Sequence, residues 1–472
     1  MEYDPKIPPY LSSDKNSFAY ISARDRWPII ITQAIDDIFQ ATRNAEVPEK
    51  ISEGKKIVEQ LAKLKYEVQH DRVLTPLPED GEPDIADYNR ELEALGNPKW
   101  FGGPWLYIEC YLYRRIAISF SLSNHWKSHD VFHRQKISTF RSSLPAVTEL
   151  AHQYEQIVST MHSEGVHTTP EQEKLLFTEV MEICLWGNAT DLSLLTSLSY
   201  DDIQKLQGAE ARKRAEKNIL ANDLPEVYDV LIKLRENGQP GEERTIDIIL
   251  DNSGFELFVD LILAGYLLET NLATNVILHP KSIPWFVSDV LPRDFFDLLS
   301  ALQNPQRFFS ESSEGSSDAT PTAPITAEQV STLSHLFNNL STHHSEGRLI
   351  IRPNLFWTSA HSYHRLPHVN EELKADLQAS QLVIFKGDLN YRKLTADAMW
   401  PPTTPFRDAI GDMAKGFRVL ALRTCKADVV VGLAEGVDER LKKETGDTGE
   451  ARKWAWGGKW AVVQFSDGKN QV

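Results

Sequence analysis

Six short apolar runs alternate with helical stretches in the second half of this chain, and this alternation most constrains its fold. The runs cover residues 246–250, 275–280, 348–353, 381–385, 418–423 and 460–465. Runs of this length, rich in β-branched residues, are typical of buried strands. Strands separated by helices form a mostly parallel sheet with helices on both faces. The sequence therefore predicts an α/β fold, with a three-layer α/β/α domain in residues 226–472.

The first part of the chain, residues 1–225, shows helical periodicity instead. Apolar residues recur at helical spacing in the segments 26–44, 50–68, 104–122 and 144–162, which are separated by loops rich in proline, glycine and aspartate. We therefore expect an all-helical amino-terminal domain packed on the α/β domain. Residues 310–326 are dense in serine, proline and acids, so we expect a disordered insertion there.

Composition limits the partners. The chain has 472 residues and a formal net charge of −17, which argues against nucleic acid or an anionic membrane as partner because both need a basic surface. No run of about 18 apolar residues occurs, and the first residues lack the basic and apolar pattern of a signal peptide. The three cysteines are too few and too widely spaced for a disulfide framework. We expect an intracellular monomer, of the cytoplasm or nucleus, that acts on a small molecule.

Two oxygen ligands stand where the run 246–250 gives way to a helix. Asp251 and Asn252 follow the last apolar residue, and from Ser253 onward apolar residues return at helical spacing. Ligands of open α/β sheets bind at the carboxyl ends of the strands. A carboxylate and an amide oxygen suit a hard cation, whereas the N–H groups of a helix start suit a phosphate. The plain alternative is that Asp251 caps an ordinary strand-to-helix turn.

Polar residues follow three further strands of the expected sheet. Lys281 and Asp289 come after the run 275–280, and Asp289 gives the cation site a third oxygen ligand. The run 381–385 leads into the glycine-containing segment 386–392, where backbone amides can approach an anion closely and an arginine can take phosphate oxygens in pairs. The run 418–423 leads to Lys426. Four strand ends thus carry residue types that bind a metal or a phosphoryl group. This agreement favours one shared binding site over the alternative that the four groups are unrelated loop residues.

The segments at these strand ends resemble the damage-control phosphatase family, also catalogued as domain of unknown function 89. The matching motifs are DNSGFE at 251–256, PWFVSDV at 284–290, KGDLNYRKL at 386–394 and an RTxK signature at 423–426, which points to the third subfamily. The helical part resembles the family in DRWP at 25–28, PWLYIECYLYRR at 104–115 and LWGNATDLS at 185–193. The resemblance implies a metal-dependent phosphatase of sugar phosphates, with a helical domain and a Rossmann-like α/β domain.

Carried over residue by residue, the resemblance implies a metal site and a substrate site. Its metal ligands are Asp251, Asn252 and Asp289, and its ions are Mn²⁺ or Ni²⁺, with Co²⁺ and Mg²⁺ as further candidates. The same three residues contact the substrate, and the other substrate-binding positions are Asp388, Leu389, Asn390, Tyr391, Arg392 and Lys426. Asp251, Asn252 and Lys426 take the catalytic roles. Fructose 1-phosphate and fructose 6-phosphate are the kind of substrate that the family suggests.

The chemistry of these residue types agrees with that assignment. A metal held by two carboxylates and an amide keeps open positions, polarises a phosphoryl oxygen and lowers the pKa of a bound water. Lys426 and Arg392 would neutralise charge on the phosphoryl oxygens as the transition state develops. The sequence leaves open whether the nucleophile is that water or a carboxylate such as Asp251. Glu256, Asn188 and Asp191 are candidates for orienting the ligands, although a helix N-cap is the simpler interpretation of the last two.

Two other interpretations compete with a phosphatase. Relatives of the family are also described as protein-glutamate carboxyl methyltransferases. A protein that binds S-adenosylmethionine is expected to have a glycine-rich loop after the first strand, but this chain has only Gly254 there. A binding protein without catalysis is the second alternative. Elsewhere, His125, His129 and His133 would share one face of a helix, but no carboxylate or cysteine in register completes a zinc site.

Overall fold

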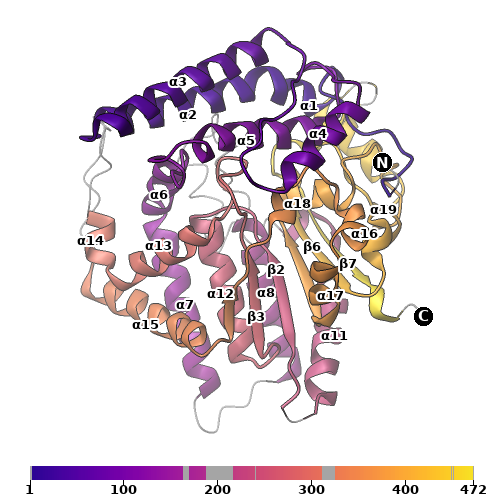
Figure 1. Ribbon diagram of the computed structural model, residues 1–472. Coiled ribbons are helices and arrows are strands. Elements are labelled where there is room, and N and C mark those ends of the chain that lie inside the picture. Colours follow the sequence, from indigo (N-terminus) through magenta and orange to yellow (C-terminus); the bar gives the residue numbers. More distant parts are fainter. Residues whose placement is uncertain are drawn as a thin grey trace.

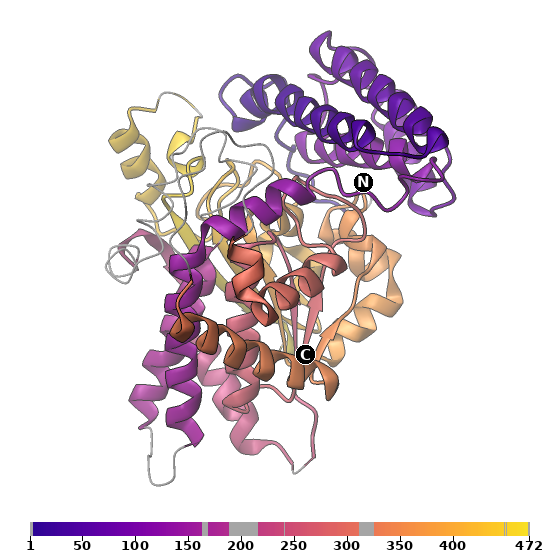
Figure 2. The same ribbon diagram turned by 90° about the vertical axis from the view of Figure 1, so that its left-hand side faces the viewer.

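A seven-stranded sheet lies at the centre of the computed structural model, with helices on both of its faces (Figure 1 and Figure 2). The structure describes residues 3–162, 169–187, 216–239, 241–310, 325–447, 449 and 451–470. The strands are β1 (Ile219–Asn222), β2 (Thr245–Ile249), β3 (Asn275–His279), β4 (Leu349–Ile351), β5 (Leu382–Lys386), β6 (Arg418–Thr424) and β7 (Ala461–Asp467). The predicted α/β class is confirmed.

The strand order in the sheet is β1-β7-β6-β5-β2-β3-β4. Strands β2 to β6 pair in parallel, β7 runs antiparallel to β6, and β1 pairs in parallel with β7 at the edge. Six of these strands lie within the apolar runs that predicted them, or within two residues of them. The sequence analysis missed β1, because a four-residue strand that is only partly buried carries too little apolar pattern to be recognised.

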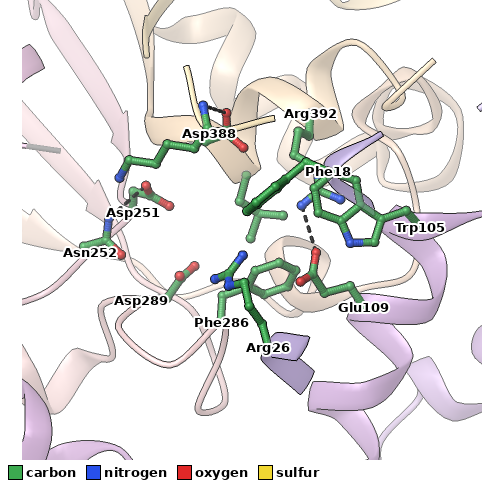
Figure 3. A pocket seen from close by; sticks show the side chains of 12 residues that line it. Phe18, Arg26, Trp105, Glu109, Asp251, Asn252, Phe286, Asp289, Asp388 and Arg392 are labelled. Carbon is green, nitrogen blue, oxygen red and sulfur yellow. Dashed lines mark hydrogen bonds and ion pairs between the residues drawn. The ribbon is translucent and has the colours of Figure 1, made fainter. Parts of the chain in front are cut away.

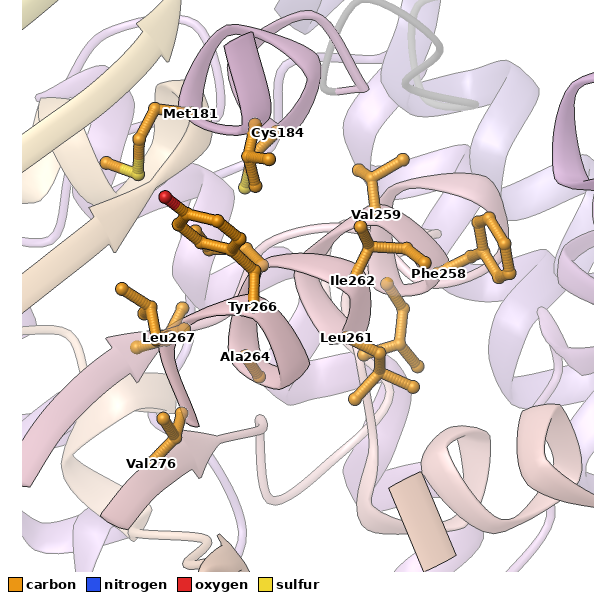
Figure 4. Packing of buried hydrophobic residues seen from close by; sticks show 14 of the residues in the cluster. Met181, Cys184, Phe258, Val259, Leu261, Ile262, Ala264, Tyr266, Leu267 and Val276 are labelled. Carbon is orange, nitrogen blue, oxygen red and sulfur yellow. The ribbon is translucent and has the colours of Figure 1, made fainter. Parts of the chain in front are cut away.

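Long helices cover the first face of the sheet. They are α7 (Leu144–His162), α8 (Pro170–Gly187), α11 (Leu224–Asn237), α12 (Phe255–Glu269), α13 (Pro292–Gln303) and α15 (Ala327–Ser345). The helix α12 is apolar nearly all round because it lies between the sheet and the helices α7 and α8, and its side chains contact both (Figure 4). This burial fixes the start of α12, and with it the turn that follows β2.

The second face of the sheet is covered by shorter helices, α16 (Leu366–Val369), α17 (Glu371–Ala379), α18 (Gly387–Leu394) and α19 (Phe406–Ala409), and α20 (Val437–Thr445) packs beyond them. A third core belongs to the amino-terminal helices α2 (Trp27–Arg43), α3 (Pro48–Gln69), α4 (Asp84–Ala94) and α5 (Trp105–Ser121). We call the segment from α1 (Phe18–Ile21), through the π-helical turn Ser22–Arg26, to α5 the helical layer; it lies across one end of the sheet (Figure 1). Its core takes in Trp285, Leu389 and Ala427, from the segments that follow β3, β5 and β6.

Part of the expected helical domain belongs to the core of the sheet. Helices α7 and α8 precede residue 225 yet pack on α12, and β1 also lies before that boundary. The division at residue 225 stays a prediction, but the segment that lies across the sheet end is α1 (Phe18–Ile21) to α5. Most of the expected insertion lies outside the described residues. Its ends are ordered, because Ser310 closes α14 (Pro305–Ser310) and Thr326 caps α15 with Gln329.

The three cysteines are buried as free thiols, in line with the absence of a disulfide framework from the sequence pattern. No helix among the described residues has the length and apolar character needed to cross a membrane.

Candidate active site

Backbone pairing brings the two predicted metal-binding turns together. Asn252, after β2, and Asp289, in the loop after β3, form an isolated antiparallel bridge. The N–H of Val290 donates to the carbonyl of Asp251 (2.8 Å), and the N–H of Ser253 donates to the carbonyl of Ser288 (2.7 Å). The preceding turn is strained, because Phe286 and Val287 have left-handed φ angles of 43° and 71°. Asp251, Asn252 and Asp289, far apart in sequence, therefore lie side by side.

These three residues form one side of a small buried pocket at the carboxyl end of the sheet, with a volume of about 40 Å³. Figure 3 shows Asp251, Asn252 and Asp289 on that side, with residues of the helical layer opposite them. The lining residues are Phe18, Arg26, Trp105, Glu109, Asp251, Asn252, Phe286, Asp289, Asp388, Leu389, Arg392 and Lys426. Seven of the nine residues predicted from the sequence for this site are on the pocket wall.

Asp251 packs directly against the start of α18. Gly387, the first residue of that helix, has a φ of 81°, and a Cβ atom built on it would lie 1.7 Å from Oδ2 of Asp251. Only glycine fits this position, both because of its φ angle and because of the space that the carboxylate occupies. The Asp251 carboxylate therefore lies between the end of β2 and the start of α18, which follows β5.

Asn252 is oriented by a buried network of charged side chains. Its Nδ2 donates to Oε2 of Glu256 (2.7 Å) and to Oδ2 of Asp251 (3.1 Å), so its Oδ1 is left to accept, as it does from Ser288. Lys386 donates to Glu256 (3.2 Å) and Asp260 (2.7 Å) behind it. Burial acts to lower the pKa of Lys386, but the neighbouring acidic groups, led by Asp260, outweigh it and raise that pKa. The expected role of Glu256 in orienting a ligand agrees with this geometry.

Asp289 and Asp388 are each held by a basic residue. The ammonium of Lys281 lies 3.1 Å from Oδ2 of Asp289 and also donates to the carbonyl of Leu250. Oδ1 of Asp388 accepts from Nε of Arg423 (2.8 Å) and from the backbone N–H of Lys426 (3.0 Å). Arg423 therefore fixes the loop on which Lys426 stands. The Lys426 side chain itself lines the pocket.

Arg392 is anchored more firmly than its sequence context suggests. Its guanidinium donates to both oxygens of Asp397 (3.2 and 3.0 Å) and to Oε2 of Glu109 (2.9 Å), and it stacks 3.5 Å above the ring of Trp105. Burial acts to lower its pKa, but Asp397 and Glu109 outweigh this effect and raise it. In this structure the charge of Arg392 is balanced by two carboxylates, Asp397 near its own helix and Glu109 on the helical layer.

Two of the predicted substrate-binding residues point away from the pocket. Asn390 donates to the carbonyls of Ile249, Leu250 and Lys386, and its Oδ1 accepts from the hydroxyl of Tyr363. The hydroxyl of Tyr391 donates to Gln464 (2.8 Å). Both side chains tie α18 to the sheet, because on a helix positions 390 and 391 face away from the side that carries 388, 389 and 392. Their role as substrate contacts stays a prediction.

The helical layer contributes pocket residues that sequence reasoning missed: Phe18, Arg26, Trp105 and Glu109. Glu109 connects the helical layer to α18. Its Oε1 accepts from the indole of Trp27 (3.2 Å), while its Oε2 accepts from Arg392. A signal was present in the sequence, since Glu109 is an acid inside the otherwise apolar run WLYIECYLY, where a buried carboxylate needs a polar partner.

One group of ligand types lies outside this pocket. Single ligand atoms of Asp130, His133 and Asp294 lie within 4.8 Å of one another, so these residues form a possible buried metal site. The ammonium of Lys136 donates to both carboxylates, at 3.0 and 2.9 Å, and already balances part of their charge. From the sequence we expected no carboxylate to complete a site for these histidines, but Asp130 and Asp294 both lie near His133. Asp294 could not be predicted because it comes from a distant helix, and α6 (His133–Ser142) contains His133 alone of the three histidines.

The remaining histidines of that set have other partners. His125 lies 3.2 Å from Glu53, and Nε2 of His129 lies 2.9 Å from Asp37. Of the three histidines, His133 alone belongs to the group of Asp130 and Asp294 described above. Asn188 and Asp191, considered as ligand-orienting residues, lie outside the part of the chain that the structure describes.

Comparison with known proteins agrees with the position of these motifs. The profile of the damage-control phosphatase ARMT1-like domain matches residues 22–441. The chain belongs to this family. It is 35% identical to the damage-control phosphatase ARMT1 of Xenopus tropicalis over 465 residues, covering 96% of this chain and 97% of that protein. The identity to the human damage-control phosphatase ARMT1 is 32% over 475 residues, covering 97% and 98% of the two chains.

A crystal structure of a DUF89 family protein from Pyrococcus horikoshii is 12% identical to this chain, with a TM-score of 0.36, and covers 93% of this chain and 97% of that one. This similarity is too weak to carry an argument about the site. The relatives named above are phosphatases by name, so a hydrolase of phosphate esters is the activity of the family.

Proposed function

We propose that this protein is a divalent-metal-dependent phosphatase of sugar phosphates, of the third subfamily, with fructose 1-phosphate and fructose 6-phosphate as its kind of substrate. One observation carries the proposal: Asp251, Asn252 and Asp289 lie together on one side of a buried pocket that Lys426 also lines. Hard oxygen ligands beside a lysine suit a metal and a phosphoryl group. The relatives of this chain are phosphatases by name, which supports phosphate-ester hydrolysis as the reaction.

The residues present fit a divalent ion. Two carboxylates and an amide oxygen form a hard donor set, and Gly387 leaves room for the Asp251 carboxylate where a larger residue would displace it. Mn²⁺ and Ni²⁺ are the ions we propose, with Co²⁺ and Mg²⁺ as alternatives. A divalent ion bound there would polarise a phosphoryl oxygen and lower the pKa of a water.

The side chains around this donor set supply the rest of the chemistry. Glu256 holds the amide of Asn252 so that its oxygen is available to a cation. Lys426, on a loop that Asp388 and Arg423 fix, would neutralise negative charge that develops on the phosphoryl oxygens. Asp251, Asn252, Asp289 and Lys426 are buried, which strengthens each of these electrostatic contacts.

The test is phosphate release from a panel of phosphate esters, with the chelated protein and after addition of each metal. We expect release only with a divalent ion, and fastest with ketose phosphates. Calorimetry with S-adenosylmethionine belongs in the same experiment. Binding of that cofactor, together with no phosphate release from any ester, would contradict the proposal and favour the methyltransferase.

A pair of lysine variants sharpens the test. Lys426→Ala should keep metal binding but lower kcat/KM. The decrease should correspond to about 2–4 kcal/mol of transition-state stabilisation, which is typical of one lost electrostatic contact in an active site. Lys459→Ala, at an exposed position, is the matched control and should retain wild-type kcat/KM. Equal activity of the two variants would place Lys426 outside the reaction.

A further inference from the structure

The helical layer contributes an arginine to the wall of the pocket. Arg26 is a lining residue, and Figure 3 shows its guanidinium pointing into the pocket beside Asp289 and Phe286. The cations among the lining residues are Arg26, Arg392 and Lys426, and they face four lining carboxylates. A phosphate dianion would add to a lining that is already net negative, so each cation that contacts it contributes to its binding.

Arg392, the arginine that sequence reasoning favoured, is poorly placed to supply that charge. Its hydrogen bonds to Asp397 and Glu109 balance its charge with two carboxylates, and Trp105 covers one face of its guanidinium. A cation that is balanced in this way adds little attraction for an anion. Arg26 comes from a different element, the π-helical turn before α2; its guanidinium lies 5.6 Å from the centre of the Phe18 ring and beside Asp289 (Figure 3).

The backbone that carries Arg26 has an unusual conformation. Residues Ser22–Arg26 form a π-helical turn, in which the N–H of Trp27 donates to the carbonyl of Ser22. Such turns are rare and are frequent at functional sites, because the extra residue changes the direction of the side chains around it. Here the turn ends at Arg26, at the point where the chain passes the pocket.

Glu109 ties this turn to the catalytic side of the pocket. Its Oε1 accepts from the indole of Trp27 (3.2 Å) and lies 3.5 Å from Oγ of Ser22, so both ends of the π-helical turn contact the same carboxylate. Its other oxygen accepts from Arg392 on α18. The position of Arg26 is thus coupled, through Glu109, to the helix that follows β5.

We propose that Arg26 is a substrate-binding residue that holds the phosphate oxygens from the side of the helical layer, opposite Lys426. The proposal rests on the proposed phosphatase function and adds a second basic residue to it. A guanidinium fork takes two phosphate oxygens at once, whereas the ammonium of Lys426 acts as a point charge. The phosphate is then held between the two domains that the sequence suggests.

The test is calorimetric titration of inorganic phosphate into the Mn²⁺-loaded protein, which needs no turnover. We expect Arg26→Gln to weaken phosphate binding by about 10- to 100-fold, the range for a lost charged hydrogen bond. Arg26→Lys should lie between, because it keeps the charge and loses the fork. The Mn²⁺ affinity of both variants should stay within about twofold of wild type, which shows that the site has folded.

Arg24→Gln is the matched control. It removes the same charge from the same π-helical turn, but the Arg24 guanidinium donates to the carbonyl of Ser12 (2.7 Å) and lies over the ring of Tyr20, away from the pocket wall. Its phosphate affinity should stay near wild type. An equal loss in Arg24→Gln and Arg26→Gln, no loss in Arg26→Gln, or no phosphate binding by the wild type would each overturn the inference. A wild type that binds phosphate through Arg26 yet hydrolyses no ester would refute the proposed function alone.

Discussion

At the scale of single residues, the contact between Gly387 and Asp251 decides whether the donor set can form. A β-carbon at position 387 would overlap the Asp251 carboxylate, which would have to leave its place beside Asn252 and Asp289. The glycine is therefore required by the site as much as by the backbone. This separates it from glycines that are needed only for their left-handed φ.

Gly387→Ala tests that distinction. Gly436 has a nearly identical φ of 83°, against 81° for Gly387, but no atom lies within 4 Å of a Cβ added there. Gly436→Ala should cost about 1–2 kcal/mol in the free energy of unfolding, the price of a left-handed alanine. Gly387→Ala should cost more than that and should also weaken Mn²⁺ binding. Chemical denaturation and metal titration of both variants measure this, and equal behaviour of the two would show that Asp251 can move freely.

A site residue could be predicted from the sequence only where the residues next to it showed a clear strand or helix pattern. Asp251, Asn252 and Asp289 follow strands whose apolar pattern is strong, so their meeting at one sheet end follows from the parallel topology. Arg26 and Glu109 precede the sheet by more than 100 residues, and nothing local shows that they reach it. The anchoring of Arg392 was missed for the same reason, since Glu109 lies 283 positions away.

At the scale of elements, the first residues of the helical layer are held over the pocket by one carboxylate. Oδ2 of Asp428 accepts from the hydroxyl of Ser17 (2.9 Å) and the N–H of Phe18 (2.8 Å), and Oδ1 accepts from the indole of Trp456 (2.8 Å). Phe18 is the first residue of α1 and lines the pocket. The attachment of α1 therefore depends on a group that is itself buried.

The ionisation of Asp428 makes stability depend on pH. Burial raises the pKa of Asp428 to about 6, with a smaller increase from Asp397, although the hydrogen bonds from Trp456, Phe18 and Ser17 lower it. The nearby guanidinium of Arg452 donates to the backbone carbonyl of Asp428. Because the folded state holds this proton more tightly than the unfolded state does, the stabilisation is complete below pH ~4 and is lost as the pH rises through ~6.

Asp428→Asn removes that ionisation. Between pH 4 and pH 7 the wild type should lose about 3 kcal/mol of unfolding free energy relative to the variant, which corresponds to the raised pKa. Denaturation at several pH values measures the difference. Asp408→Asn, at an exposed position, should show no such trend. A difference between wild type and Asp428→Asn that is constant with pH would contradict the assignment.

Elements were easier to predict than the contacts between them. The apolar runs and helical periodicity located six of the strands and the helices α2, α3, α5 and α7, because each has a repeating pattern of its own. The π-helical turn was not predictable, since its five residues differ from an α-helix only in one hydrogen bond. The packing of α7 and α8 on α12 depends on the completed sheet and has no local signal.

At the scale of the whole molecule, the pocket is closed by two parts of the chain that fold around different cores. The sheet supplies the oxygen ligands and Lys426, and the helical layer supplies Phe18, Arg26, Trp105 and Glu109. A pocket of about 40 Å³ is far smaller than the ~300 Å³ or more typical of ligand sites. We therefore expect side chains of the helical layer to shift when a sugar phosphate binds.

We propose that Asp251, Asn252 and Asp289 hold the catalytic metal, whereas Asp130, His133 and Asp294 form a second group that could bind a metal ion instead. Calorimetric titration of Mn²⁺ into the chelated wild type, Asp251→Ala and His133→Ala distinguishes the two sites. We expect a single site in the wild type that is lost in Asp251→Ala and kept in His133→Ala. Binding that survives in Asp251→Ala and disappears in His133→Ala would contradict it.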